Sequence, residues 1–254
     1  MLKSFTIVLG QGEVGRPLAD ILSTAHDVVR VDIQPVASPG PCRFMHVAIP
    51  FQIPDFIQTT EAYIRKYAPE FVVVNSTVAV GTSSRLAKVT SIPVFYSPVR
   101  GKHFRTGDDM LKYKKFVAGP SEFLATVRKH FEDAGLKTDQ ASSTDVLELM
   151  KLCETTWLGI MVGWAQEMEQ MALKIDSSYN ELERFNEEVA FIPQGIFPGV
   201  IGGHCVLPNI KLLQKFSQSN YFDAILESNE RKIAAGEREK PRERLQKPLE
   251  TKPA

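Results

Sequence analysis

Three glycines near the start of the chain have the spacing of a loop that brings backbone close to a phosphate group. Gly10, Gly12 and Gly15 form the pattern G-x-G-x-x-G. They follow the apolar run Phe5–Leu9, which predicts a β-strand, and they open residues 16–23, whose apolar spacing predicts a helix. In this context the first glycine permits a tight turn, the second lets backbone approach a pyrophosphate, and the third lets helix and strand pack closely. The free N–H groups at the start of the helix would then face the phosphates.

An acidic side chain, Asp32, stands at the end of the next apolar run, Val28–Val31. A carboxylate in this position accepts hydrogen bonds from the ribose hydroxyl groups of a dinucleotide. It would also repel the 2′-phosphate of NADP, so the pattern predicts NAD as the cofactor. The alternative is a glycine turn that serves packing alone. If the loop binds NAD, the expected contacts come from Gly10, Gln11, Gly12, Glu13, Val14, Gly15 and Asp32.

The elements that must position this loop alternate along the first half of the chain. Further strands are expected at residues 44–49, 71–74, 94–96 and 116–118, and helices at residues 54–67 and 121–134. Apolar strands separated by helices indicate a parallel sheet that is covered on both faces. The expected fold class is therefore α/β, a Rossmann-type doubly wound parallel sheet. It would form a dinucleotide-binding domain at residues 1–143.

The pattern changes at residue 144. Residues 144–174 contain no proline and have apolar side chains around much of a helical surface, which predicts one long helix buried on several sides. This is either a core helix or a dimer helix. A helix at 178–188, a loop rich in Gly and Pro at 192–208 and a helix at 212–226 complete a central helical region, residues 144–226. Residues 227–254 are rich in charges of both signs, and we expect a disordered tail or a fraying helix there.

The composition excludes several classes of protein. The 30 basic and 30 acidic side chains cancel, so the overall charge does not favour nucleic acid or a membrane surface as a partner. No apolar stretch is long enough to span a membrane. The three cysteines, Cys42, Cys153 and Cys205, lack the paired spacing of a disulfide framework or a zinc site. We therefore expect a cytoplasmic protein without a bound metal.

Several segments resemble the UDP-glucose/GDP-mannose dehydrogenase family. They are VAIPF at 47–51, NSTVAVGT at 75–82, SPVRG at 97–101, KLCETTW at 151–157 and FPGVIGGHC at 197–205. Their order and spacing extend the resemblance from about residue 2 to residue 213. The chain is similar to a shortened form of this family that lacks the C-terminal UDP-binding domain. Enzymes of the family oxidise a primary alcohol of a sugar nucleotide to an acid with two NAD, through a thiohemiacetal on a cysteine.

This resemblance implies site residues. It places Pro50, Ser76 and Thr77 beside the cofactor. Cys205 matches the nucleophilic cysteine, although it could also be a small buried residue. Lys151 matches the active-site lysine, which would stabilise an alkoxide or act as a base, and its alternative is a helix-surface lysine.

Other polar side chains lie close to these segments in the sequence. His204 would either tune the neighbouring thiol or only form hydrogen bonds within the loop. Arg100, Lys102 and His103 would bind a substrate anion or form a solvated basic turn. No metal ligands are expected.

The chain lacks carboxylates that transfer protons in the similar family. Val99 replaces the glutamate of the family's S-P-E-R segment, and Asn209 replaces an aspartate four residues after the cysteine. Thr155 replaces an asparagine of the central helix. Loss of the two carboxylates would damage thioester hydrolysis most, so we expect either a two-electron oxidation or a four-electron one with altered proton transfer. The substrate would be smaller than a nucleotide sugar, or held partly by a partner subunit.

The expected function is an NAD-dependent oxidoreductase that oxidises an alcohol of a sugar-like or hydroxylated anionic substrate. One alternative is a catalytically impaired NAD-binding subunit that regulates a partner. Another is a β-hydroxyacid-type dehydrogenase that uses Lys151, with Cys205 incidental. The long helix predicts a homodimer, as in the similar family.

Overall fold

The computed structural model describes residues 4–34, 36–37, 39–101, 105–189, 193, 195–202 and 205–235. The chain divides into two compact units, of which the first is Met1–Leu152 and the second begins at Cys153. The division falls inside the long helix α6 (Thr144–Leu173). The sequence pattern places the domain boundary at the start of this helix, and that position remains a prediction.

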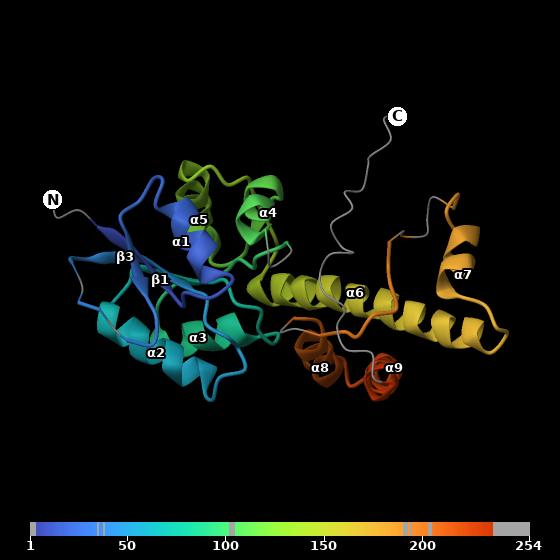
Figure 1. The fold of residues 1–254 in the computed structure, drawn as a ribbon. Helices are drawn as coiled ribbons and strands as arrows, with labels where there is room; N and C mark the ends of the chain where they lie inside the picture. The colour runs from blue at the N-terminus through green and yellow to red at the C-terminus, as the bar shows by residue number, and fades with distance from the viewer. Residues whose placement is uncertain are drawn as a thin grey trace. The chain divides into compact units, whose positions relative to one another are not determined.

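The first unit is built on a five-stranded parallel sheet (Figure 1). The strand order is β2-β1-β3-β4-β5, and all four strand pairs are parallel. The strands β1 and β4 are buried along their whole length, because helices cover both faces of the sheet. The strands are β1 (Phe5–Leu9), β2 (Val28–Val31), β3 (Cys42–Val47), β4 (Phe71–Val74) and β5 (Val94–Tyr96), and a separate parallel pair is formed by β6 (Lys115–Val117) and β7 (Thr138–Gln140).

Helices pack on the two faces of this sheet in two groups (Figure 1). On one face, α2 (Phe56–Tyr67) and α3 (Thr82–Thr90) bury Ile64 and Leu86 against the strands. The other face is covered by α1 (Gly15–Leu22), α4 (Thr106–Lys112) and α5 (Ser121–Asp133). This arrangement confirms the predicted α/β fold with a doubly wound parallel sheet.

The second unit consists of the remainder of α6 with α7 (Tyr179–Phe185), α8 (Val206–Ser217) and α9 (Asp223–Ala234). Two glycines of α6 let the other helices approach closely. A Cβ atom on Gly159 would lie 2.7 Å from Ile210 and 2.9 Å from Val206, and one on Gly163 would lie 3.3 Å from Ile225. A larger residue at Gly159 would therefore push α8 away from α6.

The prediction of a single helix at 212–226 is wrong. The helix α8 ends at Ser217, and Gln218 follows with a φ of 53°, a left-handed conformation that ends a helix. The next helix, α9, begins at Asp223 and continues to Ala234. Residues 227–234 of the expected charged tail therefore belong to a helix. Two polar side chains of this helix are buried, and Asn229 bonds to Ile201 while Lys232 bonds to Glu169. Residues 236–254 lie outside the described residues.

Two kinds of feature are absent from the described residues. None of the helices there has both the length and the apolar character that a membrane crossing needs. Nor do three or more His, Cys, Asp or Glu side chains of these residues form a group that could hold a metal ion.

Candidate functional site

The glycine loop lies at the carboxyl end of β1, and its three glycines have different surroundings. Gly10 has a φ of 94°, and a Cβ atom there would lie 2.6 Å from the carbonyl oxygen of Ala48. A Cβ atom on Gly15 would lie only 1.8 Å from the carbonyl oxygen of Gly10. Around Gly12, in contrast, no atom of the described residues would lie within 4 Å of a Cβ. Packing requires two of the glycines, and the third faces open space where a phosphate could approach, so the loop fits a pyrophosphate.

The first turn of α1 follows this loop. Its described residues include no acidic side chain, so the positive end of the helix dipole is not neutralised from within that turn. Gln11 turns back onto the strand, where its Nε2 donates to the carbonyl oxygens of Val8 at 2.9 Å and Gly10 at 3.1 Å. Gly12 and Glu13 are exposed and Val14 is half-buried. The start of α1 is therefore open to an anionic ligand.

Asp32 follows β2, the neighbour of β1, and is exposed. Its position is fixed through its backbone, because the hydroxyl of Tyr63 donates to the Asp32 carbonyl oxygen at 3.2 Å. The amide of Gly10 donates to the carbonyl oxygen of Val31 at 2.8 Å, which ties the glycine loop to the same strand end. Asp32 and the loop thus share one edge of the sheet, as a dinucleotide site requires.

The next two strand ends extend this edge. Pro50 is exposed in the segment after β3. Ser76, directly after β4, is buried and its hydroxyl donates to the carbonyl oxygen of Ile49 at 2.6 Å. Thr77 is half-buried. Since the strand order is β2-β1-β3-β4, the structure arranges Asp32, the glycine loop, Pro50 and the Ser76–Thr77 segment along adjacent strand ends.

A buried carboxylate holds the segment after β4 in place. Glu148 of α6 is 0% exposed and accepts hydrogen bonds from the amides of Gly81 at 2.7 Å and Ser83 at 2.9 Å, and from the Ser83 hydroxyl at 2.7 Å. Burial raises the pKa of Glu148, although these hydrogen bonds oppose the shift. The side chain caps the start of α3. This role could not be read from the sequence, since the partners of Glu148 lie far away in the chain.

A buried lysine reaches the end of β5. Lys115 is buried, and its Nζ donates to the carbonyl oxygens of Ser97 at 2.9 Å and Pro98 at 3.4 Å. Burial, with a smaller contribution from the charge of Lys151, lowers the pKa of Lys115 to about 7. Lys151 itself is half-buried, so it is not a fully solvated surface residue. Sequence reasoning missed Lys115, because a lysine at the start of a short strand has no distinguishing pattern.

The remaining residues of the S-P-V-R segment are only partly described. Val99 packs against the core between the sheet and α1, α4 and α5. The Arg100 guanidinium lies 5.8 Å from the centre of the Tyr113 ring, which places it against an aromatic face. The two other residues expected to bind substrate, Lys102 and His103, lie outside the described residues.

Cys205 belongs to the second unit and stands at the start of α8. It is half-buried, and its carbonyl oxygen accepts a hydrogen bond from the Asn209 amide at 3.1 Å. The positive end of the helix dipole favours the thiolate form of a cysteine in this position. Asn209 is 2% exposed, and its side-chain Nδ2 finds no hydrogen-bond partner in the described part of the chain. His204 lies outside the described residues.

The other two cysteines differ in burial. Cys42 is buried, its thiol donates to the Phe44 carbonyl oxygen at 3.4 Å, and burial raises its pKa to about 12. It is therefore a protonated structural thiol at neutral pH. Cys153 is exposed on α6.

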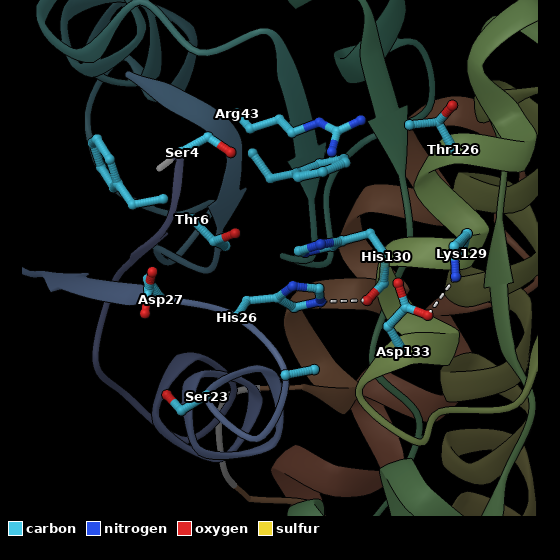
Figure 2. A pocket seen from close by; sticks show the side chains of 13 residues that line it. Ser4, Thr6, Ser23, His26, Asp27, Arg43, Thr126, Lys129, His130 and Asp133 are labelled. Atoms are coloured by element: carbon cyan, nitrogen blue, oxygen red, sulfur yellow. Dashed lines mark hydrogen bonds and ion pairs between the residues drawn. The ribbon is translucent and has the colours of Figure 1, made fainter. Parts of the chain in front are cut away.

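A separate cavity of about 470 Å³ lies at the opposite, amino-terminal edge of the sheet (Figure 2). Its lining includes His26, His130, Arg43, Lys129 and Asp133. The side chains of Lys129 and Asp133 pair at 2.7 Å, and His26 Nε2 lies 2.8 Å from the His130 carbonyl oxygen, as Figure 2 shows. Four of these residues are therefore already paired with one another, and Arg43 pairs with Glu70 at 3.6 Å. No sequence motif pointed to this cavity.

A row of buried hydrogen bonds runs from the cavity toward the carboxyl edge. His130 Nε2 lies 3.0 Å from His46 Nε2, and His46 Nδ1 lies 3.1 Å from Asn75 Oδ1. Asn75 in turn donates through Nδ2 to the Ser97 carbonyl oxygen at 2.6 Å. Burial lowers the pKa of His46 to about 3 and lowers that of His130 further. Both imidazoles are therefore neutral at physiological pH.

Comparison with known proteins identifies the fold. No protein-family model matches the sequence, and no curated protein matches it. Among solved structures, UDP-D-ManNAc dehydrogenase from Pyrococcus horikoshii has a TM-score of 0.80 and 17% identity, covering 91% of this chain and 70% of that chain. UDP-glucose dehydrogenase from Pyrobaculum islandicum has a TM-score of 0.73 and 17% identity, covering 91% of this chain and 68% of that chain.

A shorter enzyme is similar over almost its whole length. 3-Hydroxyisobutyrate dehydrogenase from Mycobacterium tuberculosis has a TM-score of 0.68 and 14% identity, covering 93% of this chain and 95% of that chain. At such identities the likeness shows the fold alone. The chain has the α/β fold that these sugar-nucleotide and hydroxyacid dehydrogenases share.

Proposed function

We propose that this chain is an NAD-dependent oxidoreductase that oxidises an alcohol group of a sugar-like or hydroxylated anionic substrate. The observation that carries the proposal is the arrangement at the carboxyl edge of the sheet. An open glycine, Gly12, lies between two glycines that packing requires, at the start of a helix and beside the exposed Asp32. The dehydrogenase fold supports the same conclusion.

Each group at this edge has a specific task. The glycine loop and the first N–H groups of α1 would hold the pyrophosphate, and Asp32 would accept hydrogen bonds from the ribose hydroxyls. When bound, NAD supplies the hydride acceptor. Lys151 would stabilise the substrate alkoxide or accept the alcohol proton. Arg100, together with Lys102 and His103, would attract an anionic group of the substrate.

Cys205 decides how far the oxidation proceeds. Its thiolate would add to the carbonyl carbon of an aldehyde product, and the resulting thiohemiacetal would keep on that carbon the hydrogen that leaves as the second hydride. The acyl product on sulfur must then be hydrolysed, and neither Val99 nor Asn209 can accept the proton of the attacking water. The side chains therefore favour a two-electron oxidation that ends at the carbonyl compound.

The test is calorimetric titration of the protein with NAD and with NADP. The wild type should bind NAD saturably and NADP more weakly. Asp32→Ala should bind NAD about tenfold more weakly, because a hydrogen bond to a charged group is lost. Absence of binding to either dinucleotide would overturn the proposal.

A β-hydroxyacid-type dehydrogenase is the second candidate. The similar 3-hydroxyisobutyrate dehydrogenase matches nearly the full length of both chains and favours this candidate. Turnover of hydroxylated acids by Lys151→Met and Cys205→Ser would distinguish the two. A Lys151 variant that is inactive beside a fully active Cys205 variant would support the hydroxyacid reaction and remove the covalent role of the thiol.

A regulatory NAD-binding subunit is the remaining alternative, because Val99 and Asn209 cannot transfer protons. NAD binding without turnover of any hydroxylated substrate, even with the partner subunit present, would favour it.

We also propose a homodimer formed through α6. Among the described residues of this helix, Trp157 is 56% exposed and Trp164 is 61% exposed. Large apolar side chains at this exposure are typical of an interface. Analytical ultracentrifugation should detect a dimer at micromolar concentration, and a monomer there would contradict the proposal.

A further inference from the structure

The glycine-rich segment that precedes Cys205 is held by one side chain of α9. The Asn229 Oδ1 accepts a hydrogen bond from the Ile201 amide at 2.7 Å, and the Asn229 Nδ2 donates to the Ile201 carbonyl oxygen at 3.3 Å. Both polar groups of one backbone residue are thus paired with one side-chain amide, as in a strand pair. Asn229 is 2% exposed and Ile201 is 6% exposed, so water does not compete with this clamp.

A second amide fixes the same segment from α6. The Gln166 Nε2 donates to the carbonyl oxygen of Gly199 at 2.7 Å and to the Asn229 Oδ1 at 3.3 Å. Gln166 is 2% exposed. Two buried amides on two different helices therefore hold the backbone at Gly199 and Ile201.

Ion pairs next to the clamp join α9 to α6. Arg231 pairs with Glu167 at 2.5 Å, and the buried Lys232 pairs with Glu169. These two ion pairs differ from the clamp because neither contact involves the segment before Cys205. They provide matched controls for the clamp.

We propose that Asn229, supported by Gln166, is a positioning residue that sets the location and reactivity of the Cys205 thiol. Ile201 lies four residues before Cys205 in the sequence, so hydrogen bonds that fix its backbone limit the positions that the thiol can reach. This proposal rests on the proposed function for the role of the thiol.

The other side of Cys205 is fixed by packing. Cys205 begins α8, whose Ile210 is 0% exposed and lies against Gly159 of α6. In the sequence, Cys205 therefore lies between the clamped Ile201 and a packed helix. Loss of the clamp would loosen the first turn of α8 and weaken the stabilisation of the thiolate by the helix start.

The experiment measures alkylation of Cys205 by iodoacetamide as a function of pH in the full-length protein. Peptide mass spectrometry follows each cysteine, and the exposed Cys153 serves as an internal reference. In the wild type, Cys205 should react at lower pH than Cys153. In Asn229→Asp, which keeps the side-chain shape but loses the Nδ2 donor, the midpoint for Cys205 should rise by about one pH unit. That shift is about a tenfold loss of thiolate below the midpoint.

Controls separate positioning from general stability. Arg231→Gln breaks the neighbouring ion pair and should leave the Cys205 midpoint unchanged. Gln166→Leu removes the second amide and should shift the midpoint in the same direction as Asn229→Asp, by a smaller amount, which keeps the test possible if Asn229→Asp does not fold. Circular dichroism verifies folding of every variant.

Three outcomes would overturn the proposal: an unchanged midpoint in both clamp variants, an equal shift in Arg231→Gln, or a wild-type Cys205 no more reactive than Cys153. NAD titration of the same variants keeps the two proposals apart. Absence of NAD binding would overturn the proposed function, whereas the alkylation result bears on the clamp alone.

Discussion

The two edges of the five-stranded sheet differ in how they present polar groups. At the carboxyl edge, the glycine loop, Asp32 and the segment after β4 follow one another along adjacent strand ends, and Gly12 faces open space. At the amino-terminal edge there is a cavity of about 470 Å³, but His26, His130, Lys129 and Asp133 around it are bonded to each other. The cavity at the amino-terminal edge is therefore not the better ligand site. An elongated dinucleotide needs a row of open backbone positions, and a cavity whose polar groups are paired offers it little.

The sharpest way to test this contrast compares two glycines of one loop. Gly15→Ala should destabilise the protein by about 3 kcal/mol, because its Cβ would lie 1.8 Å from the Gly10 carbonyl oxygen. Gly12→Ala should change the free energy of unfolding by less than about 0.5 kcal/mol, since its Cβ meets nothing. Yet Gly12→Ala should weaken NAD binding at least about tenfold, because the methyl group occupies the approach of the pyrophosphate. Urea unfolding and calorimetry measure the two effects. Unchanged NAD affinity in Gly12→Ala would place the ligand elsewhere.

The amino-terminal edge should determine the acid stability of the protein. The pKa of His46 is lowered to about 3 and that of His130 is lowered further, so the unfolded chain binds protons below pH 6.5 that the folded chain does not. Stability should therefore fall as pH falls from 6.5 toward 3. The two histidines together should cost about 3 kcal/mol between pH 6.5 and pH 5.

The double variant His46→Leu with His130→Phe removes this titration and keeps an apolar, aromatic core. Urea midpoints at pH 5 and pH 7 should differ less in this variant than in the wild type. Asp32→Ala, at the other edge, should retain the wild-type difference. An identical pH dependence in all three proteins would show that the histidines are not the source.

Lys115 should give the carboxyl edge a pH dependence of the same sign, but at higher pH. Its pKa is lowered from 10.5 to about 7, so between these values the unfolded chain binds a proton that the folded chain does not. Stability should rise with pH across this window. From pH 7 to pH 9 the wild type should gain about 2 kcal/mol relative to Lys115→Met. Thermal or urea unfolding of both proteins at the two pH values measures this gain, and parallel curves would contradict the low pKa.

The smallest effect should come from the support of Asp32. Tyr63→Phe removes the hydroxyl that donates to the Asp32 carbonyl oxygen at 3.2 Å. We expect a loss of stability of less than about 1 kcal/mol and a roughly threefold weaker binding of NAD. Calorimetry on Tyr63→Phe beside Asp32→Ala would show the order of effects. A larger loss in Tyr63→Phe than in Asp32→Ala would mean that the carboxylate itself contributes little.

The sequence predicted the strands of the sheet well and the short helices poorly. The predicted bounds of Phe71–Val74 and Val94–Tyr96 match the structure, because buried parallel strands must be continuously apolar. Those of Val28–Val31 also match, although Arg30 in this edge strand is exposed. The helices α3 and α4 were missed, since their sequences are short and polar. The start of α3 is stabilised by Glu148, which is distant in the chain.

In the candidate site, too, some features could be predicted from the sequence and others could not. The glycine pattern could be read from the sequence because backbone geometry at Gly10 and Gly15 tolerates no other residue. The roles of Lys115, Glu148 and Asn229 could not, because each depends on backbone groups that only the folded chain brings near. The cofactor and substrate contacts themselves remain predictions.

The hydrogen bonds of His26, His46 and His130 allow one consistent assignment of their ring hydrogens. A carbonyl oxygen only accepts, so His26 carries its hydrogen on Nε2 toward the His130 carbonyl. Asn75 donates through Nδ2 to Ser97, so its Oδ1 accepts from Nδ1 of the neutral His46, and His130 must donate from Nε2 to His46.

Because these hydrogen positions are fixed, the buried histidines can report on ligand binding by NMR spectroscopy. Imidazole nitrogens with and without hydrogen have well-separated nitrogen-15 chemical shifts, so each tautomer can be assigned in an isotope-labelled sample. Asn75 directly precedes Ser76, one of the residues expected to contact the cofactor. A ligand that moves this segment would change the bond to His46 Nδ1, and the nitrogen-15 resonance of the buried His46 ring would shift.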